Sequence, residues 1–358
     1  MQRVSGNQVT DTTGLIQRFK PSQWARLTAA DRQGVFLGSP RLAEVLADLE
    51  LTCLDIGARG GFTNDLLPLA SAVHAVGFEP DGSECRRLND AAAQGQHPWR
   101  SLRFIPSALG RNRGTQQLHL YRRRGCSSLY EADRQVAARF GRDGWFDLDA
   151  TLDVQTVPTD EAAARFNFTD ACFMKVDVQG AELDILASAD HLLADSLLAI
   201  RTEVEFIPIY RDQPLFSDVD QHLRRRGFIP MGFMELHEWR HLGRSPASGA
   251  RLGRTSYSRG QLVHGDVLFL RDHTRMPDDG PEATTKLLKL AFLSLTYGYV
   301  DHAAAILNRA GVRAHLQSSY GLPIEACLRE VSHELARRLT RAAWLSRLRA
   351  ARQLLVSR

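Results

Sequence analysis

Short apolar runs alternate with amphipathic stretches between Leu51 and Asp272. This alternation is typical of βαβ units, so it predicts an α/β fold with a largely parallel, Rossmann-like sheet. Strands are expected at 51–56, 73–78, 102–106, 115–121, 154–157, 171–177, 197–206, 227–233 and 265–271. Helices are expected at 62–71, 82–93, 131–139, 180–189 and 216–226.

The segments on either side of this region have a different pattern. Before it, Ser39 and Pro40 suit the N-cap and the first position of a helix. After Pro281 the apolar residues recur at helical spacing to the end of the chain. The simplest division is a helical N-terminal lead (1–50), a Rossmann-like domain (51–275) and a helical C-terminal appendage (281–358).

The last predicted helix, 324–355, carries both apolar residues and many arginines. Such a helix most often packs on the protein and keeps a solvated polar face, and contact with a second copy of the chain, as in a homodimer, is the next option. A basic amphipathic helix can also lie on an anionic membrane or on nucleic acid. A loop rich in Gly, Ser and Arg, 240–265, is expected between the last two strands.

Composition places the chain among ordinary globular proteins, with 44% hydrophobic and 24% charged residues. A net charge of +4 does not by itself call for nucleic acid. No transmembrane segment and no secretory signal is apparent, so we expect a cytoplasmic protein. The five cysteines include no C-x-x-C pair, which argues against disulfides and structural zinc, and Cys53 and Cys172 are expected to be buried.

The most informative stretch is residues 51–81, LTCLDIGARGGFTNDLLPLASAVHAVGFEPD. A strand ends at Asp55, Ile56 and Gly57, and a tight turn then opens a predicted helix whose first N–H groups are free. The turn consists of Ala58, Arg59, Gly60 and Gly61. The next strand ends at Glu79, about 20 positions after the turn, where a ribose hydroxyl pair requires an acid.

Two cofactor classes use this arrangement. A dinucleotide needs G-x-G-x-x-G for its pyrophosphate, whereas this turn is D-x-G-x-x-G-G and Asp55 would repel a phosphate. S-adenosyl-L-methionine carries no phosphate, and its amino group and sulfonium favour a nearby acid. The residues therefore favour S-adenosylmethionine, and a strand–turn–helix without ligand is the remaining alternative.

Three further residues are predicted to contact the cofactor. Pro80 directly follows Glu79, and Ser107 and Ala108 come just after the third strand, where the adenine edge lies in such a fold. An ordinary strand exit followed by a glycine turn explains Ser107 and Ala108 equally well.

Seven segments of the chain recur in order as recognisable motifs: LDIGARGG (54–61), VGFEPD (76–81), ALG (108–110), SSLY (127–130), FMKVDVQGAELDIL (173–186), EVEFIPIYRDQPLFSDVDQHLRRRGF (203–228) and GDVLFL (265–270). In these segments the sequence resembles the FkbM-type methyltransferases. The resemblance implies a Rossmann-like class I methyltransferase sheet and transfer of methyl groups to hydroxyls of sugars, polyketides and related metabolites. It also implies cofactor contacts at Asp55, Gly57 and Glu79, with Asp177 lining the site. Arg59 departs from the family, in which asparagine is expected there.

Three carboxylates are candidates for the chemistry. Asp177 follows an apolar strand, and Glu203 and Glu205 alternate on the next strand, with Val204 on the opposite face. Methyl transfer from a sulfonium needs an aligned acceptor oxygen that loses its proton, and a general base contributes about 10²–10⁴-fold. Asp177, Glu203 and Glu205 could act as this base, or they could hold a divalent metal that orients a diol. The sequence does not choose between these roles.

Structural alternatives exist for the residues after the strand. Asp177 would also serve as N-cap for the helix at 180–189, and Glu182 is favoured in a first helical turn whatever the function. Lys175 lies inside a buried strand, where a carboxylate partner is a better explanation than catalysis.

The same holds on the neighbouring strand, where Glu203 and Glu205 would pair with Arg201 or Arg211. Tyr210 would either stack on a sugar ring or close the end of the sheet. Two histidines are expected to be structural residues at strand ends: His74 and His264.

We therefore expect an S-adenosylmethionine-dependent O-methyltransferase whose partner is a hydroxyl of a sugar, polysaccharide, glycosylated molecule or secondary metabolite. A nucleic-acid methyltransferase is the first alternative, but no aromatic residues are interleaved with the arginines, so no nucleic acid is expected. The second alternative is a scaffold without catalysis, against which the presence of Asp55, Glu79 and Asp177 argues.

Overall fold

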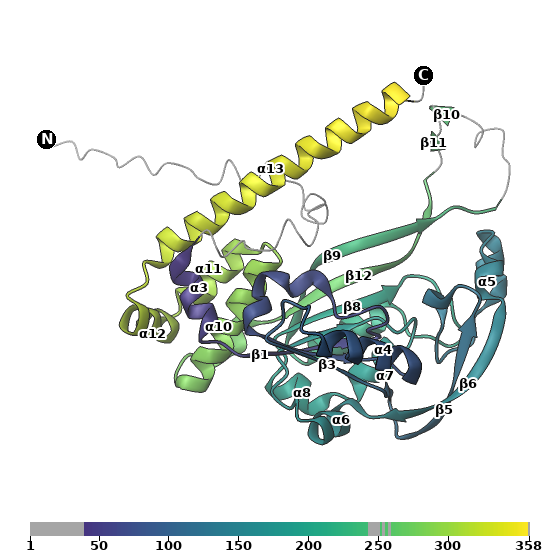
Figure 1. Cartoon of the computed structure of the whole chain (residues 1–358), viewed down its shortest axis with the longest axis horizontal. Coiled ribbons are helices and arrows are strands. Elements are labelled where there is room, and N and C mark those ends of the chain that lie inside the picture. Colours follow the sequence, from purple (N-terminus) through teal and green to yellow (C-terminus); the bar gives the residue numbers. More distant parts are fainter. Residues whose placement is uncertain (1–38, 243–250, 253–254, 257–258, 357–358) are drawn as a thin grey trace, which may run out of the picture.

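A seven-stranded sheet forms the centre of the computed structural model, which describes residues 39–242, 251–252, 255–256 and 259–356 (Figure 1). Its order is β3-β2-β1-β7-β8-β12-β9. The strands are β1 (Leu51–Ile56), β2 (Val73–Phe78), β3 (Ser101–Ile105), β7 (Phe173–Val176), β8 (Ala199–Glu205), β9 (Phe228–Trp239) and β12 (Gln261–Arg271). From β3 to β8 the strands are parallel, and β12 runs antiparallel to both β8 and β9. This confirms the predicted Rossmann-like α/β fold.

Helices cover both faces of the sheet because alternate strand residues feed two separate apolar clusters. On β1, Cys53 belongs to one cluster and Leu54 to the other. The first cluster packs against α3 (Pro40–Ala47), the 3₁₀ helix η3 (Asn64–Ala72), α4 (Gly82–Ala93) and the C-terminal helices. The second packs against α6 (Thr159–Phe166), α7 (Glu182–Ala187), α8 (Asp190–Asp195) and α9 (Phe216–Arg225).

A smaller unit, which we call the cap (residues 114–157), stands over one end of the sheet (Figure 1). It comprises β5 (Gly114–Tyr121), η4 (Arg124–Cys126), α5 (Arg134–Arg139), η5 (Asp143–Phe146) and β6 (Leu148–Val157), and β6 also pairs with β4 (Ala108–Leu109). Cap residues such as Phe140 and Phe146 form a third apolar cluster with Tyr210 and Trp239. The cap is thereby fixed to the ends of β8, β9 and β12.

Most predicted elements are present, but several differ in kind or extent. The segment expected as a helix at 62–71 is a 3₁₀ helix that contains Pro68, which has no N–H for an α-helical bond. The strand expected at 154–157 extends back to Leu148, and that expected at 227–233 continues to Trp239, because pairing with neighbouring strands lengthens both. The short helices α6 and α8 were not expected.

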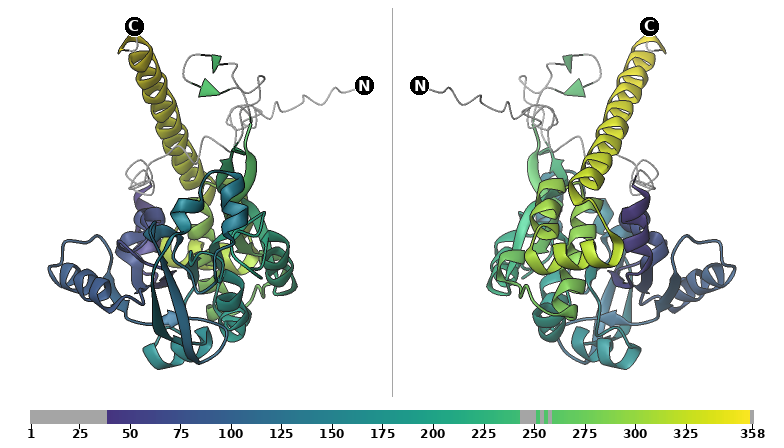
Figure 2. Two further views of the ribbon diagram at one scale, coloured as in Figure 1. Left: turned by 90° about the vertical axis from the view of Figure 1, so that its right-hand side faces the viewer. Right: turned by 90° about the vertical axis from the view of Figure 1, so that its left-hand side faces the viewer.

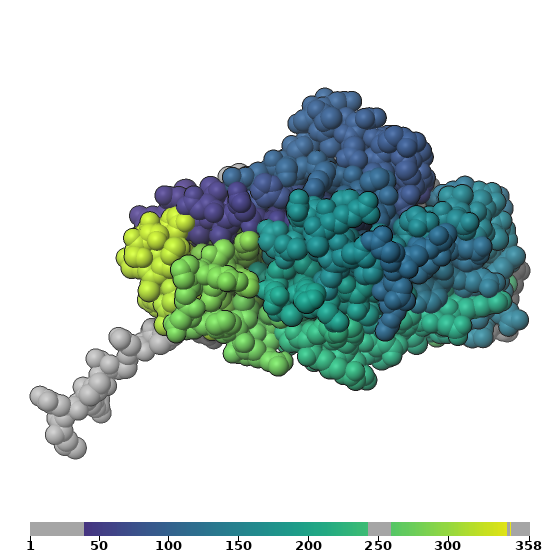
Figure 3. Space-filling view, turned by 90° about the horizontal axis from the view of Figure 1, so that it is seen from below, coloured from purple at the N-terminus to yellow at the C-terminus, as the bar shows by residue number. Residues whose placement is uncertain are grey.

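The C-terminal helices share a core with the sheet. They are α10 (Pro281–Thr296), α11 (Val300–Leu307), α12 (Ala310–Tyr320) and α13 (Ile324–Val356), preceded by η7 (His273–Arg275). Leu287 and Phe292 of α10 lie in the same cluster as Leu51 of β1. Seen from below, these helices form one continuous surface with α3 and the sheet region (Figure 3).

Beyond Leu335 the helix α13 leaves this core and projects from the body of the molecule (Figure 2). Trp344, on the projecting part, is 60% exposed. No helix among the described residues combines the length and the apolar character that a membrane crossing needs.

Two other predictions fall largely on residues that lie outside the described part of the chain. Of the predicted N-terminal lead, residues 1–38 lie outside the described residues, and α3 is the helix expected after Ser39. Within the predicted loop 240–265, β10 (Arg251–Leu252) pairs with β11 (Thr255–Ser256), and 243–250, 253–254 and 257–258 lie outside the described residues.

Candidate functional site at the carboxyl edge of the sheet

The turn after β1 is held tightly against its neighbours. The amides of Gly57 and Ala58 both donate to the carbonyl oxygen of Phe78, at distances of 3.2 and 2.9 Å. Gly57 has φ +85°, and a Cβ there would lie 2.0 Å from the carbonyl oxygen of Asp177. Glycine is therefore required for this turn to pass the loop that follows β7.

Most of the amide groups of the turn donate to acceptors within the protein. Gly60 donates to the Glu84 carboxylate at 3.3 Å, and Gly61 donates to the carbonyl oxygen of Ala58 at 3.0 Å. Arg59 is exposed and its guanidinium lies 3.9 Å from the Asp81 carboxylate. The turn therefore does not present the free N–H groups that the sequence predicted. A phosphate would find few hydrogen-bond donors here.

Glu79 directly follows β2 and is only 3% exposed. One carboxylate oxygen accepts a 2.8 Å hydrogen bond from the amide of Asp81, and burial raises the pKa of the Glu79 carboxyl. The amide of Glu79 in turn donates to Ile105, so the ends of β2 and β3 are joined. Pro80 and Ser107, both half-buried, flank this junction, and the adjoining Ala108 is buried.

Asp55 and Asp177 share one lysine. The ammonium of Lys175 lies 3.4 Å from Asp55 and 3.2 Å from Asp177, which confirms the expected carboxylate partner. Asp55 is 2% exposed and also accepts a 2.7 Å hydrogen bond from the amide of Thr63. Burial raises the pKa of Asp55. Burial acts likewise on Asp177, but there Lys175 and a hydrogen bond from Gln179 outweigh it and lower the pKa.

Glu203 connects the strands β7, β8 and β12. One of its oxygens accepts a hydrogen bond from the Gln179 side chain, and the other lies 2.9 Å from Nδ1 of His264. Gln179 also donates to Asp177 at 3.1 Å, and its φ of +60° is rare outside glycine. Burial, with Asp177 and Asp266 nearby, raises the pKa of Glu203 well above its ordinary value, while burial lowers that of His264.

Two more buried glutamates adjoin this group. Glu182 folds back on its own loop and accepts hydrogen bonds of 2.9 Å from the amides of Val178 and Gly180. Burial, assisted by Glu203, raises its pKa to about 8. Glu205 is 3% exposed, and burial together with Glu182 and Glu203 raises its pKa well above the ordinary value.

The structure decides several of the alternatives left open by the sequence. Asp177 is not an N-cap, because α7 begins at Glu182 after Ala181 and has no side-chain cap. Tyr210 is 1% exposed and donates to the carbonyl oxygen of Cys126, so it closes the sheet end. All five cysteines are buried and free. Within the described chain, no cluster of three or more His, Cys, Asp or Glu side chains has the arrangement of a metal site.

The arginines expected to pair with Glu203 and Glu205 have other partners. Arg201 forms ion pairs with Asp65 and Asp266, and Arg211 pairs with Glu131. Arg201, on β8, therefore links η3 to the neighbouring strand β12.

From the sequence, His264 was expected to have a structural role at a strand end, and its contact with Glu203 was not predicted. His264 is opposite Glu205 in the β8–β12 register, and its ring stacks on His237 at 4.4 Å. The available signal was weak: β12 had to be recognised as the antiparallel neighbour of β8 for His264 to meet Glu203. His74, by contrast, bonds Ser101 on the opposite edge of the sheet.

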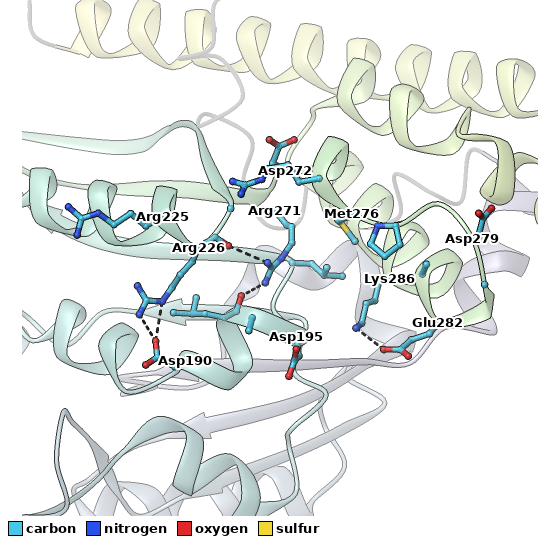
Figure 4. Close-up of a pocket in the computed structure, with 18 of the residues that line it drawn as sticks. Asp190, Asp195, Arg225, Arg226, Arg271, Asp272, Met276, Asp279, Glu282 and Lys286 are labelled. Carbon is cyan, nitrogen blue, oxygen red and sulfur yellow. Dashed lines mark hydrogen bonds and ion pairs between the residues drawn. The ribbon is translucent and has the colours of Figure 1, made fainter.

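A separate pocket of about 980 Å³ lies at the other edge of the sheet (Figure 4). Its walls come from α8, the end of α9, the end of β12 and the start of α10. Arg226 pairs with Asp190, Lys286 pairs with Glu282, and Arg271 donates to backbone carbonyls. None of the predicted site residues lines this pocket, so it is not the candidate site.

Residues 55–230 carry a methyltransferase domain, and their sheet is of the Rossmann-like class I type. Residues 55–230 match the sequence profile of the methyltransferase FkbM domain, and this domain belongs to the FkbM methyltransferase family. No curated protein matches the sequence.

Two solved structures illustrate the similarity. Magnesium protoporphyrin IX methyltransferase from Synechocystis PCC 6803, determined with bound S-adenosylmethionine, is 11% identical over 75% of this chain and 86% of that chain, with a TM-score of 0.32. Methyltransferase FkbM from Methylobacillus flagellatus KT is 13% identical over 62% of this chain and 44% of that chain, with a TM-score of 0.33.

Proposed function

We propose that this protein transfers the methyl group of S-adenosylmethionine to a hydroxyl of a sugar or glycosylated small molecule. The observation that carries the proposal is the hydrogen-bonded pair Glu203–His264. It lies at the same sheet edge as the glycine turn and Glu79. The proposed site therefore has two adjoining halves. The cofactor half is the glycine turn with its surrounding acids, and the acceptor half is the Glu203–His264 pair.

The cofactor half suits a ligand that is cationic and lacks phosphate. Asp55, Glu79 and Asp177 place three acids around a turn whose own amides are largely occupied. In the proposal Glu79 accepts hydrogen bonds from the ribose hydroxyls, and Gly57 gives the ligand close access to the backbone. S-adenosylmethionine, when bound, supplies the methyl group on its sulfonium. Asp55 lies behind the turn, where it holds Lys175 and the amide of Thr63 in place.

The acceptor half holds the base. When Nδ1–H of His264 donates to ionised Glu203, Nε2 is left as an acceptor that can take a proton from a hydroxyl. Glu203 then stabilises the positive imidazolium. Asp177 is a weaker base than this pair because Lys175 lowers its pKa, so we assign it to positioning. Among the described residues, Nε2 of His264 makes no hydrogen bond.

The carboxylate oxygens here have protein donors. Lys175 and Gln179 contact Asp177, and Gln179 and His264 contact Glu203. We therefore propose transfer without a divalent metal. Turnover that EDTA abolishes and magnesium or manganese restores would instead assign Asp177 and Glu203 to a metal.

The test compares His264→Asn with Asp177→Asn. Removal of the general base should lower kcat by about 10²–10⁴-fold, with S-adenosylmethionine affinity changed by less than about tenfold. Asp177→Asn should lower kcat less and raise the KM for the acceptor. Methyl transfer is followed as S-adenosylhomocysteine formation over a panel of sugars, nucleotide sugars and glycosylated metabolites.

The pH profile separates a base from a structural residue. In the wild type kcat/KM should rise with pH as the Glu203–His264 pair loses its proton, and this limb should disappear in His264→Asn. His74→Asn is the matched control, because His74 lies outside the site. Normal turnover of the His264→Asn enzyme would show that His264 is not the general base and would reassign that role to Asp177 or Glu205. Methylation of RNA but of no sugar would favour the nucleic-acid alternative.

A further inference from the structure

Two arginines of the cap lie on one tryptophan beside the proposed acceptor half. The guanidinium carbon of Arg123 is 3.7 Å from the centre of the Trp145 ring, and that of Arg142 is 3.9 Å from it. Arg142 also lies over Trp239, at 4.7 Å. Stacking of this kind occupies the flat face of a guanidinium and leaves its N–H edge available to an acceptor.

Neither arginine has an acidic partner in the described chain. Nearby cap arginines do, since Arg124 pairs with Asp149 and Arg134 pairs with Asp147. Nε of Arg142 is buried and makes no hydrogen bond. Burial and the nearby Arg123 both lower the pKa of Arg142.

A single aromatic ring, that of Trp239, lies between Arg142 and the proposed base His264. Trp239, which contacts Arg142, packs edge-on against His264 with ring centres 6.0 Å apart. Arg123 is exposed, so the pair is accessible from solvent. An unpaired double charge costs folding free energy, and a bound anion would offset that cost.

We propose that Arg123 and Arg142 bind an oxyanion, a phosphate or a carboxylate, carried by the methyl acceptor close to its reacting hydroxyl. The acceptor class is then an anionic sugar, such as a sugar phosphate or a uronic acid, rather than a neutral one. The N–H edge of each guanidinium presents two parallel donors that match the geometry of either oxyanion. This inference rests on the proposed function, because it assigns the acceptor of that same site.

The experiment measures binding of glucose 6-phosphate, glucuronate, pyrophosphate and neutral glucose to the full chain saturated with S-adenosylhomocysteine. Calorimetry should detect the anions and not glucose. Arg123→Gln, Arg142→Gln and the double variant should weaken anion binding, the double variant by at least about tenfold. The glucose 6-phosphate and glucuronate arms show which oxyanion is preferred.

Arg139→Gln is the matched control, since Arg139 is an exposed arginine on α5 outside the pair. It should bind every anion as the wild type does. Unchanged S-adenosylhomocysteine affinity and thermal unfolding in the Arg123→Gln variant exclude a folding defect. The inference fails if the wild type binds no anion better than glucose, or if Arg139→Gln weakens binding as much as the pair. A wild type that does not bind S-adenosylhomocysteine would instead contradict the proposed function.

Discussion

The cofactor half of the site comes from one short stretch of chain, whereas the acceptor half is assembled from distant ones. Residues 55–81 supply the glycine turn and Glu79, and they bond mainly to one another and to the adjoining strands. On the acceptor side, Glu203 meets Gln179 and His264, and the cap contributes Arg142 from yet another segment.

The two halves also differ in how their charges are balanced. Asp55 and Asp177 share Lys175, so two of the three acids of the cofactor half have a cationic partner within the protein. The acceptor half holds Glu203 and Glu205 with raised pKa values and an arginine pair without acids. Internal compensation suits a fixed cradle, and unpaired charges suit a surface that a ligand completes.

The largest expected effect comes from breaking the cofactor half at Gly57. Gly57→Ala places a methyl group on the Asp177 carbonyl at a positive φ, so it should cost more than about 4 kcal/mol and abolish S-adenosylmethionine binding. Gly60→Ala is the matched control, because Gly60 has φ +87° but nothing within 4 Å of the added Cβ. It should cost about 1–2 kcal/mol. Thermal unfolding and cofactor titration measure both, and equal losses would contradict the close-approach argument.

A smaller effect is expected at Glu79, which tests whether the two halves are separable. Glu79→Gln keeps the shape and the bond from the Asp81 amide, but it removes the charge that would hold the ribose. S-adenosylmethionine should bind about 10–100-fold more weakly, since hydrogen bonds to charged groups contribute about 1.5–3 kcal/mol. At saturating cofactor kcat should stay near the wild-type value. A fall in kcat with normal cofactor affinity would reverse the assignment.

The smallest expected effect is a pH dependence of stability in the acceptor half. Because its pKa is raised on folding, Glu205 contributes stability that is present below its unfolded pKa and is lost as pH rises through the folded value. The free energy of unfolding should therefore fall as pH rises above the ordinary glutamate pKa of about 4.3, and Glu205→Gln should reduce that fall by about 1 kcal/mol or more. Urea unfolding at several pH values measures this. Glu131→Gln, at an exposed position, should leave the pH dependence of the free energy of unfolding unchanged. An equal change in both variants would contradict the role assigned to Glu205.

Much of the fold follows from local pattern. The alternation of apolar runs predicts β1, β2 and the helix α4 at their observed bounds, because period-2 and period-3.6 patterns are local properties. The η3 segment was misassigned as an α-helix, since its apolar spacing resembles one and only Pro68 indicates otherwise. Strand ends such as Leu148 and Trp239 were missed because they depend on pairing partners.

By itself, the sequence determined the Rossmann-like class, the glycine turn and the acid at Glu79, because each depends on residues near one another in the chain. Only the tertiary structure decided that His264 meets Glu203, that Lys175 serves both Asp55 and Asp177, and that Arg123 and Arg142 share one indole ring. These contacts join strands and a cap far apart in sequence. Their energies depend on burial and on neighbouring charges, which exist only once the sheet has formed.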